Sequence, residues 1–102
     1  MGELLLVLMV AGCFGDDTIA CDFRAESDRC QDRSGTQAAS PLAFEATCEA
    51  AAGDYLDGPC PRSGIIGGCD IDDGDVIDWY YAPKTLADVE FACEGDGEVV
   101  PP

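Results

Sequence analysis

Val76-Ile77-Asp78-Trp79-Tyr80-Tyr81 is the most strand-prone stretch of this chain of 102 residues. β-Branched and aromatic side chains, which favour extended backbone, fill every position of the stretch except Asp78. The typical hairpin turn Asp73-Gly74 precedes it, and the apolar stretch 65–71 precedes that turn. The pattern predicts an antiparallel hairpin over residues 65–81, which ends before Pro83.

One short helix is predicted on each side of the hairpin. The first follows Ser40, a preferred N-cap, and Pro41 suits the first helical position. Its residues 42–52 are rich in Ala, Leu and Glu, and Gly53 ends it. The second follows Thr85, which approximates a capping box with Asp88, and ends at Gly95.

Three further strands complete the expected fold. Short strands are predicted at 54–57 and 98–100, and a short edge strand is predicted near Cys30. We therefore expect a small α+β domain, with two short helices packed on a small antiparallel sheet.

The spacing of the two helices suggests a two-fold internal repeat. Eight residues separate Ser40 from Cys48, the same number separates Thr85 from Cys93, and a glutamate follows each cysteine. This pattern predicts two strand–helix–strand halves that share one sheet. Chance similarity between two short capped helices is the alternative.

Cysteine usage predicts that disulfides hold the domain together. The chain has seven cysteines, and without Cys13 the other six form an even set, Cys21, Cys30, Cys48, Cys60, Cys69 and Cys93. Three disulfides imply an oxidising compartment and suit a domain whose core is small. Repeat symmetry favours the pairs 30–48, 69–93 and 21–60, and Cys48 with Cys60 is a rival pair.

The N-terminal segment predicts export. An apolar run from Leu4 to Val10 leads into Val10-Ala11-Gly12-Cys13, which resembles the processing site of bacterial lipoproteins. We therefore expect residues 1–12 to be a signal peptide, Cys13 to carry the lipid, residues 13–20 to be a tether and residues 21–102 to be the domain. Met1-Gly2-Glu3 lacks a basic residue, which a start further upstream would explain. A buried strand or helix is the alternative for this segment.

The formal net charge of −16 restricts the partners. Removing residues 1–12 removes only Glu3, so the mature chain has 20 acidic and 5 basic residues and a charge of −15. Such a surface repels nucleic acid and anionic lipid headgroups. We expect no nucleic-acid partner, and we expect membrane contact through the lipid on Cys13.

No catalytic or metal-binding pattern is found in the sequence. The chain has no histidine, which argues against Ser-His or Cys-His catalysis, and its cysteines lack the close pairs that zinc sites use. In the acidic stretch 70–78, placing Gly74 at the sixth position of a calcium loop puts Cys69 and Ile71 where acids are required. An acidic hairpin turn explains the same residues, so we expect neither a metal nor another cofactor.

Trp79, Tyr80 and Tyr81 form the one aromatic cluster. Along a strand Trp79 and Tyr81 share one face and Tyr80 takes the other. These residues are the candidate ligand-binding residues if one face is solvated, and packing against a helix is the alternative.

With these features placed, the chain resembles the small cysteine-rich lipoproteins of myxobacteria and related predatory bacteria. The resemblance rests on these segments: Val10-Ala11-Gly12-Cys13, Cys48-Glu49-Ala50-Ala51, Cys60-Pro61, Gly67-Gly68-Cys69, Trp79-Tyr80-Tyr81 and Ala92-Cys93-Glu94. It implies a location in the cell envelope and no catalytic residue.

The expected function is a non-enzymatic, lipid-anchored envelope protein with a structural or interaction role and an envelope glycan or protein as its partner. The alternative is a carbohydrate- or peptide-binding module that uses the Trp79 face. The residue after the lipidated cysteine is Phe14. Some bacteria retain a lipoprotein in the inner membrane when an aspartate occupies this position, so Phe14 favours the outer membrane.

The predicted disulfides lead to a first test. Each disulfide that closes a loop of about 15–25 residues stabilises the fold by about 3 kcal/mol in the chain-entropy model, so reduction is expected to unfold the domain. Near-UV circular dichroism with and without a reductant measures this. A reduced sample that keeps its native spectrum would contradict the prediction.

Overall fold

A computed structural model of the protein describes residues 18–95 and 97–102; the segments 1–17 and 96 lie outside this description. The predictions of a signal peptide, of a lipid on Cys13 and of most of the tether therefore fall outside the described residues. The elements follow in the order β1 (Ile19–Asp22), α2 (Arg24–Ser27), β2 (Arg29–Arg33), a 3-10 turn (Gly35–Ala38), α3 (Pro41–Ala50), β3 (Asp54–Leu56), β4 (Ile65–Asp70), β5 (Val76–Tyr81), α4 (Leu86–Cys93) and β6 (Glu98–Val100).

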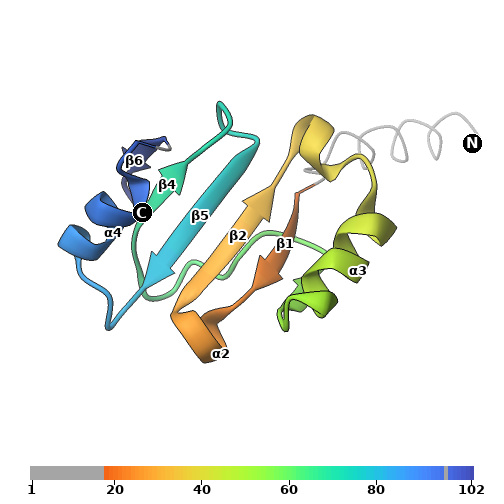
Figure 1. Cartoon of the computed structure of the whole chain (residues 1–102), viewed down its shortest axis with the longest axis horizontal. Helices are drawn as coiled ribbons and strands as arrows, with labels where there is room; N and C mark the ends of the chain where they lie inside the picture. The colour runs from red at the N-terminus through yellow and green to blue at the C-terminus, as the bar shows by residue number, and fades with distance from the viewer. Residues whose placement is uncertain (1–17, 96) are drawn as a thin grey trace, which may run out of the picture.

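All six strands form one antiparallel sheet in the order β3-β1-β2-β5-β4-β6 (Figure 1). The predicted hairpin is confirmed as β4 and β5, and the predicted helices are confirmed as α3 and α4. Thr85 and Asp88 form the capping box at the start of α4, because each side chain accepts a hydrogen bond from the backbone N–H of the other residue. The small α+β fold class is therefore as expected.

Both helices lie on the same side of the sheet, over its two ends (Figure 1). Cys21 of β1 pairs with Gln31 of β2, Gln31 with Asp78 of β5, and Asp78 with Cys69 of β4. Paired residues point to the same side of a sheet, so the whole row shares one face. Disulfides join Cys21 to α3 and Cys69 to α4, which defines this side as the helix face.

Each half of the sheet has the same order of elements. A hairpin is followed by a helix and then by a three-residue strand, which pairs with the first strand of that hairpin. The halves meet where β2 pairs with β5. The internal repeat in the sequence stays a prediction.

The disulfides connect Cys21 with Cys48, Cys30 with Cys60 and Cys69 with Cys93, across sequence separations of 27, 30 and 24 residues. The pair of Cys69 and Cys93 is therefore confirmed, and the expected pairs of Cys30 with Cys48 and Cys21 with Cys60 are wrong, as is the rival pair of Cys48 with Cys60. The reason is the alternation of faces along strands. Cys30 is adjacent to Gln31 and points away from the helix face, so it cannot reach Cys48 on α3.

The opposite face of the sheet is covered by residues 57–64, which we call the strap because the Cys30–Cys60 disulfide ties it to β2. Beneath it, one cluster of buried residues includes Cys30, Cys60, Trp79 and Tyr81. The Trp79 ring lies close to Gly68, its cross-strand partner, where an added Cβ would meet the indole at 2.6 Å. Glycine at position 68 therefore leaves the space that the indole ring occupies.

One buried carboxylate joins the strap to the sheet. Asp32 is 7% exposed, and its two carboxylate oxygens accept hydrogen bonds from the backbone N–H of Cys60, at 2.7 Å, and from the indole N–H of Trp79, at 2.9 Å. The Tyr81 hydroxyl donates to the carbonyl oxygen of Pro61 at 2.6 Å. The polar groups that this packing removes from water are thereby paired.

The N-terminal part of the sheet differs from the expectation in three respects. The strand near Cys30 is β2, which lies at the centre of the sheet and not at its edge. β1 begins at Ile19, inside the segment expected to be tether, because Ile19 and Ala20 pair with β2 and are buried. The single-turn helix α2 joins β1 to β2 and was not predicted.

Truncation of Asp32 tests the junction between strap and sheet. Asp32→Ala leaves two buried N–H donors unpaired, so we expect the free energy of unfolding to fall by about 2–4 kcal/mol. Trp79, the only tryptophan, reports urea unfolding by its fluorescence. Asp57→Asn, at an exposed carboxylate, is the matched control and should change stability by less than about 0.5 kcal/mol. Equal stability of the two variants would contradict this role of Asp32.

Candidate functional site

The helix face is open at the centre of the sheet. α3 contacts β1 and β3, and α4 contacts β4 and β6, so β2 and β5 run between the two helices (Figure 1). From these central strands five polar side chains point to the helix face, and we call them the central strip. They are Arg29, Gln31, Arg33, Asp78 and Tyr80.

The local sequence explains why this strip is polar. In Arg29-Cys30-Gln31-Asp32-Arg33 the burial alternates, with Cys30 and Asp32 buried beneath the strap and the other three residues half-buried. A strand with this period places its long polar side chains on one face. The same alternation in β5 sends Trp79 and Tyr81 to the strap face, and Asp78 and Tyr80 to the strip.

A continuous chain of hydrogen bonds links four of the five side chains of the strip, all except Tyr80. Arg33 Nε donates to the side-chain oxygen of Gln31 at 2.9 Å, and Gln31 Nε2 donates to Asp78 Oδ1 at 2.9 Å. Arg29 Nη1 donates to the same oxygen of Asp78 at 3.1 Å and forms an ion pair with it. These contacts fix the orientation of Gln31 and leave further N–H groups of both guanidinium groups available to a ligand.

Aromatic rings hold both arginines in place. The Arg29 guanidinium carbon lies 4.5 Å from the centroid of the Phe23 ring, and that of Arg33 lies 4.7 Å from the centroid of Phe44. Cation–π stacking of this kind orients the planar group and leaves its edge free for hydrogen bonds. The strip therefore presents two pre-oriented guanidinium groups.

A depression of about 160 Å³ lies between the strip and α3. Nine residues line it. We call the three polar ones from β2 (Arg29, Gln31 and Arg33) its rim, and the remaining ones, which are mostly apolar, its floor: Cys21, Phe23, Phe44, Thr47, Cys48 and Ala51.

The charge of the strip is unlike that of the whole chain. Two of the five basic residues lie on it beside a single carboxylate, whereas the chain as a whole has 21 acidic residues. The strip thus carries a local net charge of +1 within a strongly acidic protein. Burial, and then the neighbouring Asp78, raise the pKa of Tyr80, although Arg29 acts in the opposite direction.

The aromatic residues predicted to bind a ligand are divided between the two faces. Trp79 and Tyr81 are each 5% exposed beneath the strap, and the guanidinium carbon of Arg62 lies 4.8 Å from the Trp79 ring centroid. In this arrangement neither ring offers an open platform. Tyr80 alone of the three points to the open helix face.

Sequence reasoning missed the strip itself. The sequence predicted only a short edge strand near Cys30 and placed Asp78 in the acidic stretch 70–78, so neither pattern indicated a site formed by Arg29, Arg33 and Asp78. The sequence carried little signal for the strip, because Asp32 is charged and only Cys30 between 29 and 33 is of a residue type that is usually buried; the alternation of burial appears once β2 is placed at the centre of the sheet.

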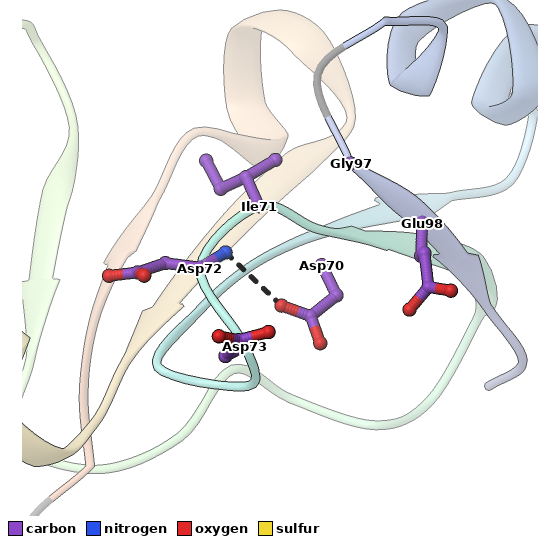
Figure 2. Close-up of a pocket in the computed structure, with 6 residues that line it drawn as sticks. All are labelled: Asp70, Ile71, Asp72, Asp73, Gly97 and Glu98. Atoms are coloured by element: carbon purple, nitrogen blue, oxygen red, sulfur yellow. Dashed lines mark hydrogen bonds between the residues drawn. The ribbon is translucent and has the colours of Figure 1, made fainter.

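A second depression, of about 340 Å³, lies at the acidic turn between β4 and β5 (Figure 2). Asp70 Oδ1 accepts hydrogen bonds from the backbone N–H groups of Asp72, at 3.2 Å, and Gly74, at 2.7 Å, so this oxygen closes the turn. Figure 2 shows the Asp72 carboxylate pointing away from those of Asp70 and Glu98. Among the described residues no cluster of three His, Cys, Asp or Glu side chains has metal-binding geometry.

No family model, no curated protein and no solved structure matches this chain. Within residues 18–95 and 97–102, no helix has both the length and the apolar content that a membrane span requires.

The burial of Tyr81 leads to a prediction for alkaline pH. Burial, with smaller contributions from Asp22 and Asp32, raises the pKa of Tyr81 to about 12, although the nearby Arg24 acts in the opposite direction. A phenol whose pKa is higher in the folded state than in the unfolded state contributes its full stabilisation below the unfolded-state pKa of about 10. We expect this stability to be lost as the pH rises from about 10 to about 12.

Tyrosinate absorbance and urea unfolding across this pH range measure the effect. Tyr81→Phe should lack the last tyrosine ionisation step and lose stability less steeply with pH, although loss of the hydrogen bond to Pro61 costs about 1 kcal/mol at neutral pH. Tyr80→Phe is the control and should retain that last step. A wild-type protein whose tyrosines all ionise near pH 10 would contradict the prediction.

Proposed function

We propose that this protein is a non-enzymatic, lipid-anchored protein of the bacterial cell envelope, with an interaction role served by the central strip. One observation carries the proposal. Six of the seven cysteines are buried and joined in three disulfides within the domain, which leaves Cys13 as the remaining cysteine. Disulfides form and persist in exported proteins, and a leftover cysteine in such a protein needs a separate explanation.

A lipid on Cys13 provides that explanation. Cys13 follows the apolar run and the small residues Ala11 and Gly12, which suits a lipoprotein signal peptidase. β1 begins at Ile19, so the residues between Cys13 and the sheet span at most about 20 Å when fully extended. The tether then keeps the domain close to the membrane surface, and the outer membrane is the membrane that we propose.

The open surface of the domain supports an interaction role. The strap covers one face of the sheet, whereas the central strip on the other face displays two oriented guanidinium groups beside an apolar depression. Convergent polar groups next to apolar surface are typical of binding sites. The alternative, carbohydrate or peptide binding through the Trp79 face, requires the strap to move away from the Trp79 ring, and the strip supplies a peptide-binding surface without that movement.

The lipid anchor is tested by fractionation and mass spectrometry. The full-length chain, expressed in a bacterium with a lipoprotein-processing pathway, should lose residues 1–12, gain the mass of an acyl-bearing group on Cys13 and fractionate with membranes. Cys13→Ser, the matched control, should leave the membrane fraction and keep its three disulfides. A wild-type chain with an intact N-terminus, or with free thiols among the other six cysteines, would overturn the proposal.

A further inference from the structure

The depression beside α3 combines two features that a single ligand group can satisfy. Its floor includes the Phe23 and Phe44 rings and the Cys21–Cys48 disulfide, and its rim includes Arg33. We propose that it binds the C-terminal carboxylate of a peptide whose last side chain is apolar. This inference rests on the interaction role proposed above and names the class of partner.

The size of the depression suits one apolar side chain. Its volume is about 160 Å³, and apolar cavities of roughly 150 Å³ hold a group as large as benzene. In a C-terminal residue the carboxylate and the side chain branch from the same Cα. The side chain can therefore occupy the floor while the carboxylate stays at the rim.

The rim offers the donors that a carboxylate requires. Arg33 uses Nε to donate to Gln31, it forms no ion pair among the described residues, and its ring contact with Phe44 holds the guanidinium plane. The terminal nitrogens of such a group donate two parallel hydrogen bonds to a carboxylate. Asp78 does not cancel this charge, because its carboxylate is already paired with Arg29.

The charge of the whole chain selects against other anions. A nucleic acid or a uronic-acid polymer brings many negative charges toward a protein of net charge −16, and each additional charge is repelled. A peptide terminus brings one carboxylate to the small positive region and is repelled least. The combination of a basic rim with an acidic surround therefore favours a single terminal carboxylate over a polyanion.

The test uses the oxidised protein and three short synthetic peptides. One ends in leucine with a free carboxylate, the second is its C-terminal amide, and the third ends in glycine with a free carboxylate. We expect the leucine acid to bind at least about tenfold more tightly than either of the other two peptides, as measured by calorimetry. Equal binding of the acid and the amide would overturn the proposal.

Two arginine variants separate recognition from folding. Arg33→Gln should weaken binding of the leucine acid by about tenfold, whereas Arg62→Gln, whose side chain stacks on Trp79 on the other face, should bind as wild type does. Near-UV circular dichroism establishes that both variants are folded. The Arg33→Gln variant should bind the acid and amide peptides equally. The contact between the guanidinium and the terminal carboxylate is already absent in this variant, so replacing the carboxylate by an amide removes nothing further.

Three outcomes would overturn the inference. They are unchanged binding by Arg33→Gln, a preserved difference between acid and amide in that variant, and tighter binding of a uronic-acid oligomer than of the leucine acid. The fractionation experiment on Cys13 is independent of these results. A failure of peptide binding therefore counts against the ligand class alone, whereas unprocessed Cys13 counts against the envelope location.

Discussion

The alternation of side chains along β2 is the constraint on which the rest of the structure depends. Cys30 and Asp32 point to one face, where they bind the strap covalently and by a hydrogen bond to the backbone of Cys60. Arg29, Gln31 and Arg33 point to the other face, where they form the strip together with Asp78 and Tyr80 of β5. A register shift of one residue would bury both arginines beneath the strap and expose a disulfide cysteine, so the pairing of β2 with both of its neighbours is strongly determined.

Two like-charge pairs lie across the outer strands of the sheet, each in a half that a sheet-to-helix disulfide holds together. Asp22 lies opposite Asp54 across β1 and β3, and Asp70 lies opposite Glu98 across β4 and β6. Like charges directly opposite one another destabilise a sheet. Arg24 relieves the first pair through an ion pair with Asp22 at 2.9 Å, and no basic residue among those described pairs with the second. In each half a disulfide between the sheet and its helix reinforces the affected region, at Cys21 and at Cys69 respectively.

Local signals in the sequence predicted most elements but not their partners. The β-branched run at 76–81, the Asp73-Gly74 turn and the Thr85 cap act over a few residues, and each element they predict is present. The pairs of Cys21 and Cys30 depend on which face each cysteine occupies, and that follows only from the register of β1 on β2.

The strip was missed for the same reason. Two arginines and a glutamine in a polar stretch are typical of solvated side chains, and only the central position of β2 in the sheet indicates otherwise. Asp78 is 47 residues away from Gln31 in the sequence, and only the fold brings the two side chains together.

The polarity of the strip also explains why the helices leave the middle of the sheet open. A helix packed over β2 and β5 would remove two guanidinium groups and a carboxylate from water, and burying such charges costs several kcal/mol for each ion unless every group is paired. Over the outer strands the helices instead pack on apolar surface. Phe44 of α3 packs with Ile19 and Tyr55, and Val89 of α4 lies close to Gly67. The same side chains that keep the helices apart therefore stay only half-buried between them.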